Sequence, residues 1–62
     1  MNKSPKEIVA EAAALRSSAL DMLRRAQAGD SPLPGHSADD AARMLTENIA
    51  AYDDMIRRNA RA

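Results

Sequence analysis

The sequence predicts an all-α protein, an antiparallel two-helix hairpin that assembles into a homo-oligomeric helical bundle. Apolar residues recur at three- and four-residue steps in two long segments, as they do on one face of an amphipathic helix. A serine that can cap a helix precedes each segment, and the run GDSPLPGHS, which a helix cannot cross, separates them. We therefore expect a single domain in which helix 5–28, turn 29–37 and helix 38–59 follow one another.

The first predicted helix begins in the run SPKE. Ser4 can cap the helix, Pro5 occupies the first helical position, where its missing N–H costs nothing, and Glu7 can complete a capping box. Gly29 can adopt the left-handed conformation that commonly ends a helix. The residues expected on the buried face are Ile8, Ala12, Leu15, Ala19, Met22 and Ala26, with Val9, Leu20 and Leu23 widening the apolar stripe.

The turn and the second helix follow from the same kinds of signal. Two prolines and two glycines interrupt the helical pattern in residues 29–37, and the short connection requires the two helices to be antiparallel. Ser37 can cap the second helix, and Asp39 and Asp40 suit its positively polarised first turn. The expected buried face is Ala38, Ala42, Leu45, Ile49, Tyr52, Ile56 and Asn59, with Ala41, Met44, Ala51 and Met55 as a flanking row.

The interior of one hairpin is expected to be thin. Although 45% of the residues are apolar, many are alanines, which bring little area to a core. Chains this short usually need a disulfide, a metal or a partner subunit, but this one has no cysteine, and its only histidine, His36, cannot form a metal site alone. Self-association remains, and we expect it through rows left exposed on a monomer: Leu20, Leu23, Met44 and Met55.

The charge pattern argues against several classes of function. Nine acidic and nine basic residues cancel, so the overall field does not recruit nucleic acid. No apolar run approaches the roughly 20 residues of a membrane span, and MNKSPKE does not read as a signal peptide, so we expect a soluble, cytoplasmic protein. The side chains of the adjacent acidic pairs, Asp39 with Asp40 and Asp53 with Asp54, point about 100° apart on a helix and do not converge on a reacting atom. We expect no catalytic residue, no metal ligand and no cofactor.

The closing run LTENIAAYDDMIRRNARA contains the only aromatic residue and three arginines. Basic residues complement the negative end of a helix dipole, and acid–base pairs four residues apart support an exposed helix by about 0.2–0.5 kcal/mol. The expected pairs are Asp21 with Arg25, Asp53 with Arg57 and Asp54 with Arg58. Across the antiparallel hairpin we also expect Arg24 and Arg25 near Asp39 and Asp40, and the end with Arg57, Arg58 and Arg61 near Glu7 and Glu11.

The same run also permits a binding site. Tyr52 and Ile56 share a face, and Arg58 and Asn59 follow about one turn later. An aromatic ring beside guanidinium and amide donors suits a nucleotide. The run is thus open to two interpretations, an ordinary helix end or a ligand site formed where helix ends meet in an oligomer.

The run LTENIAAYDDMIRRN, residues 45–59, resembles the second helix of the hairpin domain of phage-encoded cyclic-nucleotide sponges, which counter bacterial CBASS or Thoeris signalling by sequestering the messenger. The resemblance implies a non-enzymatic oligomer of hairpins that binds a cyclic oligonucleotide or a cyclic ADP-ribose derivative between subunits, with Arg58 and Asn59 as ligand-binding residues. The aromatic residue of that family falls at Ala51, one residue before Tyr52. The matching residues are Ala41, Leu45, Glu47, Ile49, Ile56, Arg58 and Asn59.

Two other functions remain open. A hairpin of this kind can lay a leucine and methionine face on a bacterial target protein and inhibit it. A dimer of hairpins can also form a four-helix bundle that binds structured RNA, although the sequence has no continuous basic stripe. For the preferred sponge hypothesis, the candidate ligand-binding residues are Arg58, Asn59 and Tyr52.

Overall fold

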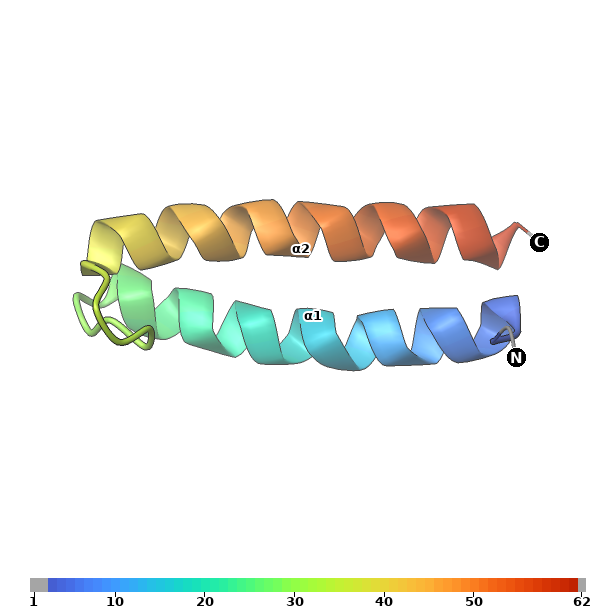
Figure 1. Ribbon diagram of the computed structural model, residues 1–62, viewed down its shortest axis with the longest axis horizontal. Helices are drawn as coiled ribbons and strands as arrows, with labels where there is room; N and C mark the ends of the chain where they lie inside the picture. The colour runs from blue at the N-terminus through green and yellow to red at the C-terminus, as the bar shows by residue number, and fades with distance from the viewer. Residues whose placement is uncertain (1–2, 62) are drawn as a thin grey trace.

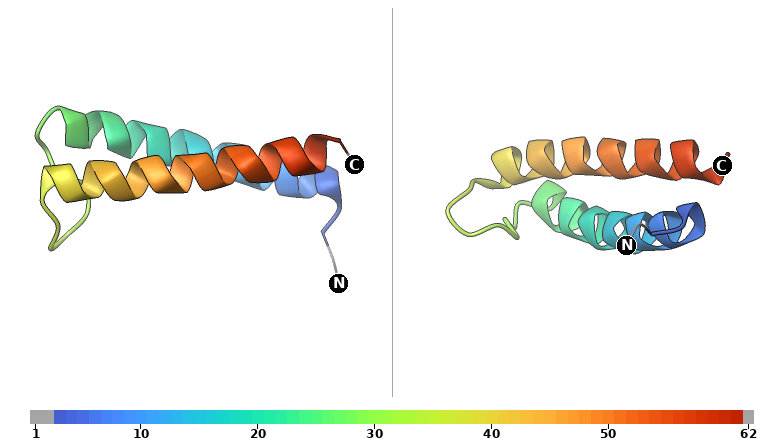
Figure 2. Two further views of the ribbon diagram at one scale, coloured as in Figure 1. Left: turned by 90° about the horizontal axis from the view of Figure 1, so that it is seen from above. Right: turned by 45° about the vertical axis from the view of Figure 1, so that its right-hand side comes forward.

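A computed structural model describes residues 3–61 and contains two helices, α1 (Pro5–Gln27) and α2 (Ala38–Ala60). They lie side by side and antiparallel, with the connection at one end and both termini at the other (Figure 1). The predicted hairpin is therefore confirmed, with α1 ending one residue earlier than expected and α2 ending one residue later. The molecule is elongated, 39 × 20 × 14 Å, and Figure 2 shows the helices adjacent along their whole length.

The predicted caps begin both helices. The Ser4 hydroxyl accepts a hydrogen bond from the Glu7 backbone N–H at 3.2 Å, and the Ser37 hydroxyl accepts one from the Asp40 N–H at 3.1 Å. Each bond satisfies one of the backbone donors that a helix start leaves free. The Glu7 carboxylate accepts from the Ser4 hydroxyl at 3.2 Å, so this contact joins the two side chains, unlike the backbone contact of a standard capping box.

The end of α1 is set by Gly29, whose φ of 91° lies in the left-handed region. Its N–H donates to the Ala26 carbonyl at 3.0 Å, and the Asp30 N–H donates to the Arg25 carbonyl at 3.0 Å. These two bonds form the Schellman arrangement that terminates many helices. In the following turn the Ser31 hydroxyl donates to the His36 carbonyl at 2.7 Å, so the connection is held by its own hydrogen bonds.

The line of contact between the helices is built mainly from alanine. Ala12, Ala19 and Ala26 recur every seven residues along α1 and are buried, and the buried residues of α2 are Ala41 and Leu45. Small side chains let the two backbones approach closely, and seven residues fall about 20° short of two full helical turns, which keeps the alanines on one line. Within residues 3–61, Leu45 is the only large residue in this buried set.

Two residues predicted to be buried are exposed, and seven others are only half-buried: Ile8, Ala38, Ala42, Ile49, Tyr52, Ile56 and Asn59. Leu15 is 52% exposed and Met22 is 37% exposed. They stand about 40° to 60° to one side of the alanine line, and the alanines bring the helices too close together for larger side chains to fit between them. The prediction was also wrong for Leu20 and Leu23, which are half-buried, whereas the predicted exposure of Met44 and Met55 is confirmed.

The two long sides of the hairpin therefore differ. On one side the Arg16 Nε donates to the Asp53 Oδ1 at 2.5 Å, joining α1 to α2 beside half-buried Leu20, Leu23 and Ile49; we call this the ion-pair side. We call the opposite side the apolar side. It carries the residues Leu15, Met22, Leu33, Met44, Tyr52 and Met55, and these include all four large hydrophobic residues that are exposed within residues 3–61.

Candidate functional site

The three candidate ligand-binding residues lie on the second half of α2. Tyr52 and Asn59 are seven residues apart and share a face, and both are half-buried. Arg58 lies about 120° around the helix from Tyr52, and its side chain is 79% exposed. A single hairpin therefore brings Tyr52 and Asn59 to one face and does not bring Arg58 to Tyr52.

Arg58 belongs to an arginine cluster on the outer surface of α2. The cluster consists of Arg57, Arg58 and Arg61 around Asp54, and these four residues line a shallow surface hollow. The Arg58 Nε lies 3.0 Å from the Asp54 Oδ2, and the Arg57 Nη2 lies 3.5 Å from the Asp54 Oδ1. Three guanidinium groups around one carboxylate leave two net positive charges in a chain whose total charge is zero. The cluster is a local basic site on a neutral protein.

Asn59 has a structural explanation in the helix itself. Its side-chain Nδ2 donates to the Met55 carbonyl at 2.7 Å, one turn earlier. The Met55 carbonyl lies inside α2, where the Asn59 backbone N–H is its helical partner, so the side-chain amide adds a second donor to the same carbonyl. The Asn59 side chain is therefore engaged within its own helix in a single hairpin, which the dipole and salt-bridge arguments from the sequence did not reveal.

The ion pairs differ from those expected from the sequence. Asp54 with Arg58 is confirmed, but the expected pair of Asp53 with Arg57 is wrong because Asp53 bonds Arg16 instead. The expected pair of Asp21 with Arg25 and the pairs across the hairpin ends do not form among residues 3–61. The pairs in the described part of the chain are Lys3 with Glu11, Arg16 with Asp53, Arg43 with Asp40, and Asp54 with Arg57 and Arg58.

The pairs across the ends fail for a geometric reason. Helices that run antiparallel place opposite charges near each other along the axis, but contact also requires the side chains to point toward the neighbouring helix. Arg24 and Arg25 stand more than 100° from the Ala12–Ala26 line of α1, on the outer part of the helix surface. Arg57 and Arg58 occupy equivalent outer positions on α2, so these arginines extend into solvent.

The contact between Arg16 and Asp53 was not predicted. It spans 37 positions in the sequence, and among residues 3–61 it is the only ion pair that connects α1 to α2. Arg16 directly follows Leu15, and Asp53 directly follows Tyr52, so each charged residue stands one position past a residue of the predicted buried face. A charge at the edge of each apolar stripe was the signal that could have identified this pair.

Tyr52 lines an apolar groove on the apolar side. The groove runs between the helices and contains no charged side chain. Three of the four exposed large hydrophobic residues form the edges of this groove: Leu15, Met22 and Met44. The full lining is Leu15, Ser18, Ala19 and Met22 of α1, Leu33 of the turn, and Met44, Leu45, Asn48 and Tyr52 of α2.

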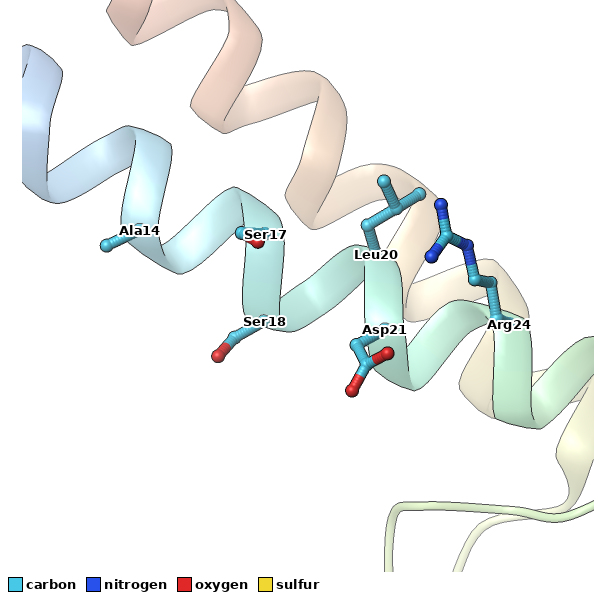
Figure 3. A pocket seen from close by; sticks show the side chains of 6 residues that line it. All are labelled: Ala14, Ser17, Ser18, Leu20, Asp21 and Arg24. Atoms are coloured by element: carbon cyan, nitrogen blue, oxygen red, sulfur yellow. The ribbon is translucent and has the colours of Figure 1, made fainter.

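A second hollow lies on the outer surface of α1 and is shown in Figure 3. Small side chains produce it, since its floor is Ala14, Ser17 and Ser18. The Asp21 carboxylate and the Arg24 guanidinium point away from each other in Figure 3, so they do not converge on a common ligand. This hollow is a consequence of small residues on a helix surface and does not have the geometry of a site.

The described residues also bear on metals and membranes. Across residues 3–61, no three histidine, aspartate or glutamate side chains gather closely enough to hold a metal ion. Neither α1 nor α2 combines the length and the apolar character that crossing a membrane requires. No family model, curated protein or solved structure matches this chain.

Proposed function

We propose that this chain is a non-enzymatic binding protein that acts as a homo-oligomer of hairpins and sequesters a cyclic nucleotide, of the type that serves as an immune messenger in bacteria. The observation that supports the proposal is the arginine cluster, in which Arg58 is 79% exposed and shares one carboxylate with Arg57. Guanidinium groups bind phosphate oxygens with two parallel hydrogen bonds, so an exposed cluster of three suits a phosphorylated ligand.

Asp54 has a defined part in this proposal. It accepts a hydrogen bond from Arg57 and forms an ion pair with Arg58, which orders two long side chains that would otherwise lose rotamer freedom on binding. A ligand phosphate adds to the remaining donors of each guanidinium, since arginine carries five N–H donors and Asp54 engages only part of them. The cluster is therefore ordered in advance and still able to bind an anion.

A nucleotide also needs a surface for its base, and Tyr52 is the only aromatic residue of the chain. Because Tyr52 and Arg58 lie about 120° apart on α2, one hairpin cannot direct both at the same ligand. The proposal therefore requires assembly, with the ring of one subunit facing the arginines of another. If the chain is encoded by a phage, such an oligomer would act in the host cytoplasm by lowering the free concentration of the messenger, without turnover.

Calorimetric titration tests this function. The ligands are a panel of cyclic dinucleotides, cyclic trinucleotides and cyclic ADP-ribose isomers, and at least one is expected to bind with a Kd below about 10 μM, or about −7 kcal/mol. The variant Arg58→Ala should lose that binding and keep its helicity by circular dichroism. Arg43→Ala is the matched control, because Arg43 is also an exposed, aspartate-paired arginine of α2. A panel without a ligand of this affinity would refute the proposal.

The apolar groove favours a second candidate, a module that inhibits a target protein by helix packing. In that case the purified chain should keep its groove open, and its methionines should react with dilute peroxide at any protein concentration. A dimer that binds structured RNA is a third candidate. It would give a salt-dependent shift in RNA mobility, because binding to phosphates releases counterions.

A further inference from the structure

We propose that the apolar side is covered by a second copy of the same chain, which packs its own apolar side against it to form a four-helix bundle. The inference takes from the proposed function only that the chain is a homo-oligomer, and it does not depend on a ligand. In this bundle the Tyr52 ring is covered, so a nucleotide would bind through the arginine cluster alone. Four observations carry it: the surface area of one chain, the difference between its two sides, the neutral groove and the charges along the groove.

The first observation is the excess surface area. A compact monomer of 6.7 kDa is expected to expose about 3900 Å², whereas this chain exposes 4622 Å². The excess, about 700 Å², is close to the roughly 800 Å² per partner that a standard protein interface buries. The radius of gyration agrees, at 13.3 Å against about 10.6 Å for a compact chain of this length. Covering one long side would bring the exposed area near the normal value.

The second observation shows which side is covered. Leu15, Met22, Met44 and Met55 are the exposed large hydrophobic residues of the described chain, and all four lie on the apolar side. On the opposite side the Arg16 and Asp53 pair closes the contact between the helices. A chain with one unsatisfied side is completed by one partner layer, which is the arrangement of two hairpins in a four-helix bundle. A hairpin with no exposed apolar side would have no such surface for a partner to cover.

The groove itself suits an identical surface. Its lining is uncharged, so burying it leaves no ion without a partner. Its polar side chains, Ser18 and Asn48, lie between larger apolar residues and can bond across a two-fold axis. In a two-fold dimer the same patch serves both subunits, and an uncharged patch cannot repel its own copy.

The charges at the edges of the apolar side favour a second copy of the chain over a partner protein whose charges all have one sign. Along this edge α1 carries Glu11 near its start and Arg25 near its end, and α2 carries Asp40 near its start and Arg58 near its end. Two-fold packing of hairpins makes every neighbouring pair of helices antiparallel, whether α1 lies on the α2 or on the α1 of the partner. Each acidic start then lies beside a basic end, so like charges do not meet across the edge. Within one chain Glu11, Asp40 and Arg58 already pair with Lys3, Arg43 and Asp54.

The test is the mass of the ligand-free protein in solution, measured by sedimentation equilibrium. At concentrations of about 100 μM we expect twice the monomer mass of 6.7 kDa. Met44→Lys should place a charge on the interface and raise the dissociation constant at least about 100-fold, since burying an unpaired charge costs several kcal/mol. Ser17→Lys is the control, because Ser17 lies on the outer surface of α1, and its dissociation constant should stay within about twofold of the wild type.

A second measurement covers the case in which Met44→Lys fails to fold. The fluorescence of Tyr52, the only aromatic residue, reports on the groove of the unmodified protein. Quenching by acrylamide should weaken several-fold as the protein concentration rises through the dissociation constant. A monomer mass at 1 mM, with quenching that stays strong at every concentration, would overturn the inference and leave the apolar side for a different protein. Because no nucleotide is present, this result is separate from the titration that tests the proposed function.

Discussion

The two long sides of the hairpin are built from similar helices and differ in how they are closed. On the ion-pair side, Arg16 and Asp53 join the helices, and neighbouring Leu20 is half-buried. On the apolar side, Leu15 is 52% exposed at an edge of an open groove. The comparison shows that an amphipathic stripe alone does not determine which residues a small hairpin buries. The residues one position beyond the contact line decide whether a side is finished within one chain.

The alanines explain why both outcomes occur in one molecule. Ala12, Ala19 and Ala26 bring the helices close together, so large side chains stand on either side of the contact line. A side with a charged pair at its edge can end in solvent, because the charges remain hydrated. A side whose groove is bordered by leucine and methionine keeps apolar area in contact with water. The apolar side is thus left incomplete within one chain.

The largest effect is expected at the contact line that the two sides share. Leu45→Ala removes the only large side chain in the buried set of residues 3–61 and should lower the free energy of unfolding by about 2–5 kcal/mol. Urea unfolding followed by circular dichroism measures the loss. Ser17→Ala, on the outer surface of α1, is the control and should change the stability by less than about 0.5 kcal/mol. A small change for Leu45→Ala would mean that the contact line contributes little and that the chain depends almost wholly on assembly.

A smaller effect separates the two sides directly. Ile49→Ala, on the ion-pair side, removes a half-buried side chain and should cost about 1–2 kcal/mol at any protein concentration. Met44→Ala, on the apolar side, should cost less than about 0.5 kcal/mol in a dilute monomer and more as the concentration rises. Thermal unfolding at 2 μM and at 200 μM distinguishes them. An equal concentration dependence for both variants would remove the distinction between the sides.

Much of this fold could be predicted from the sequence because its determinants are local. Ser4, Ser37 and Gly29 act within a few residues of themselves, and they mark three of the four helix ends to within one residue. Burial was harder to predict, because Leu15 and Ala12 share a stripe and only the close approach of the helices separates them. The sequence contains the stripe but not the distance between the helices.

The candidate site was predictable only in part, for the same reason. The angle between Tyr52 and Arg58 follows from the 100° step of a helix and could have been calculated in advance. The bond from Asn59 to the Met55 carbonyl depends on a rotamer, and the contact of Arg16 with Asp53 depends on how the turn aligns the two helices. Whether an arginine and a tyrosine meet across subunits depends on an assembly that lies outside one chain.

The smallest effect concerns the pair that closes the ion-pair side. The Arg16 and Asp53 side chains are 38% and 47% exposed, so solvent screening limits their interaction to about 0.2–1 kcal/mol. A double-mutant cycle with Arg16→Ala, Asp53→Ala and the double variant isolates this term from the loss of packing. The coupling should fall at 1 M salt, because added ions screen the attraction between partly exposed charges. A coupling near zero at low salt would show that the packing of Leu20, Leu23 and Ile49 closes this side. The Arg16 and Asp53 side chains would then only provide a hydrated polar edge.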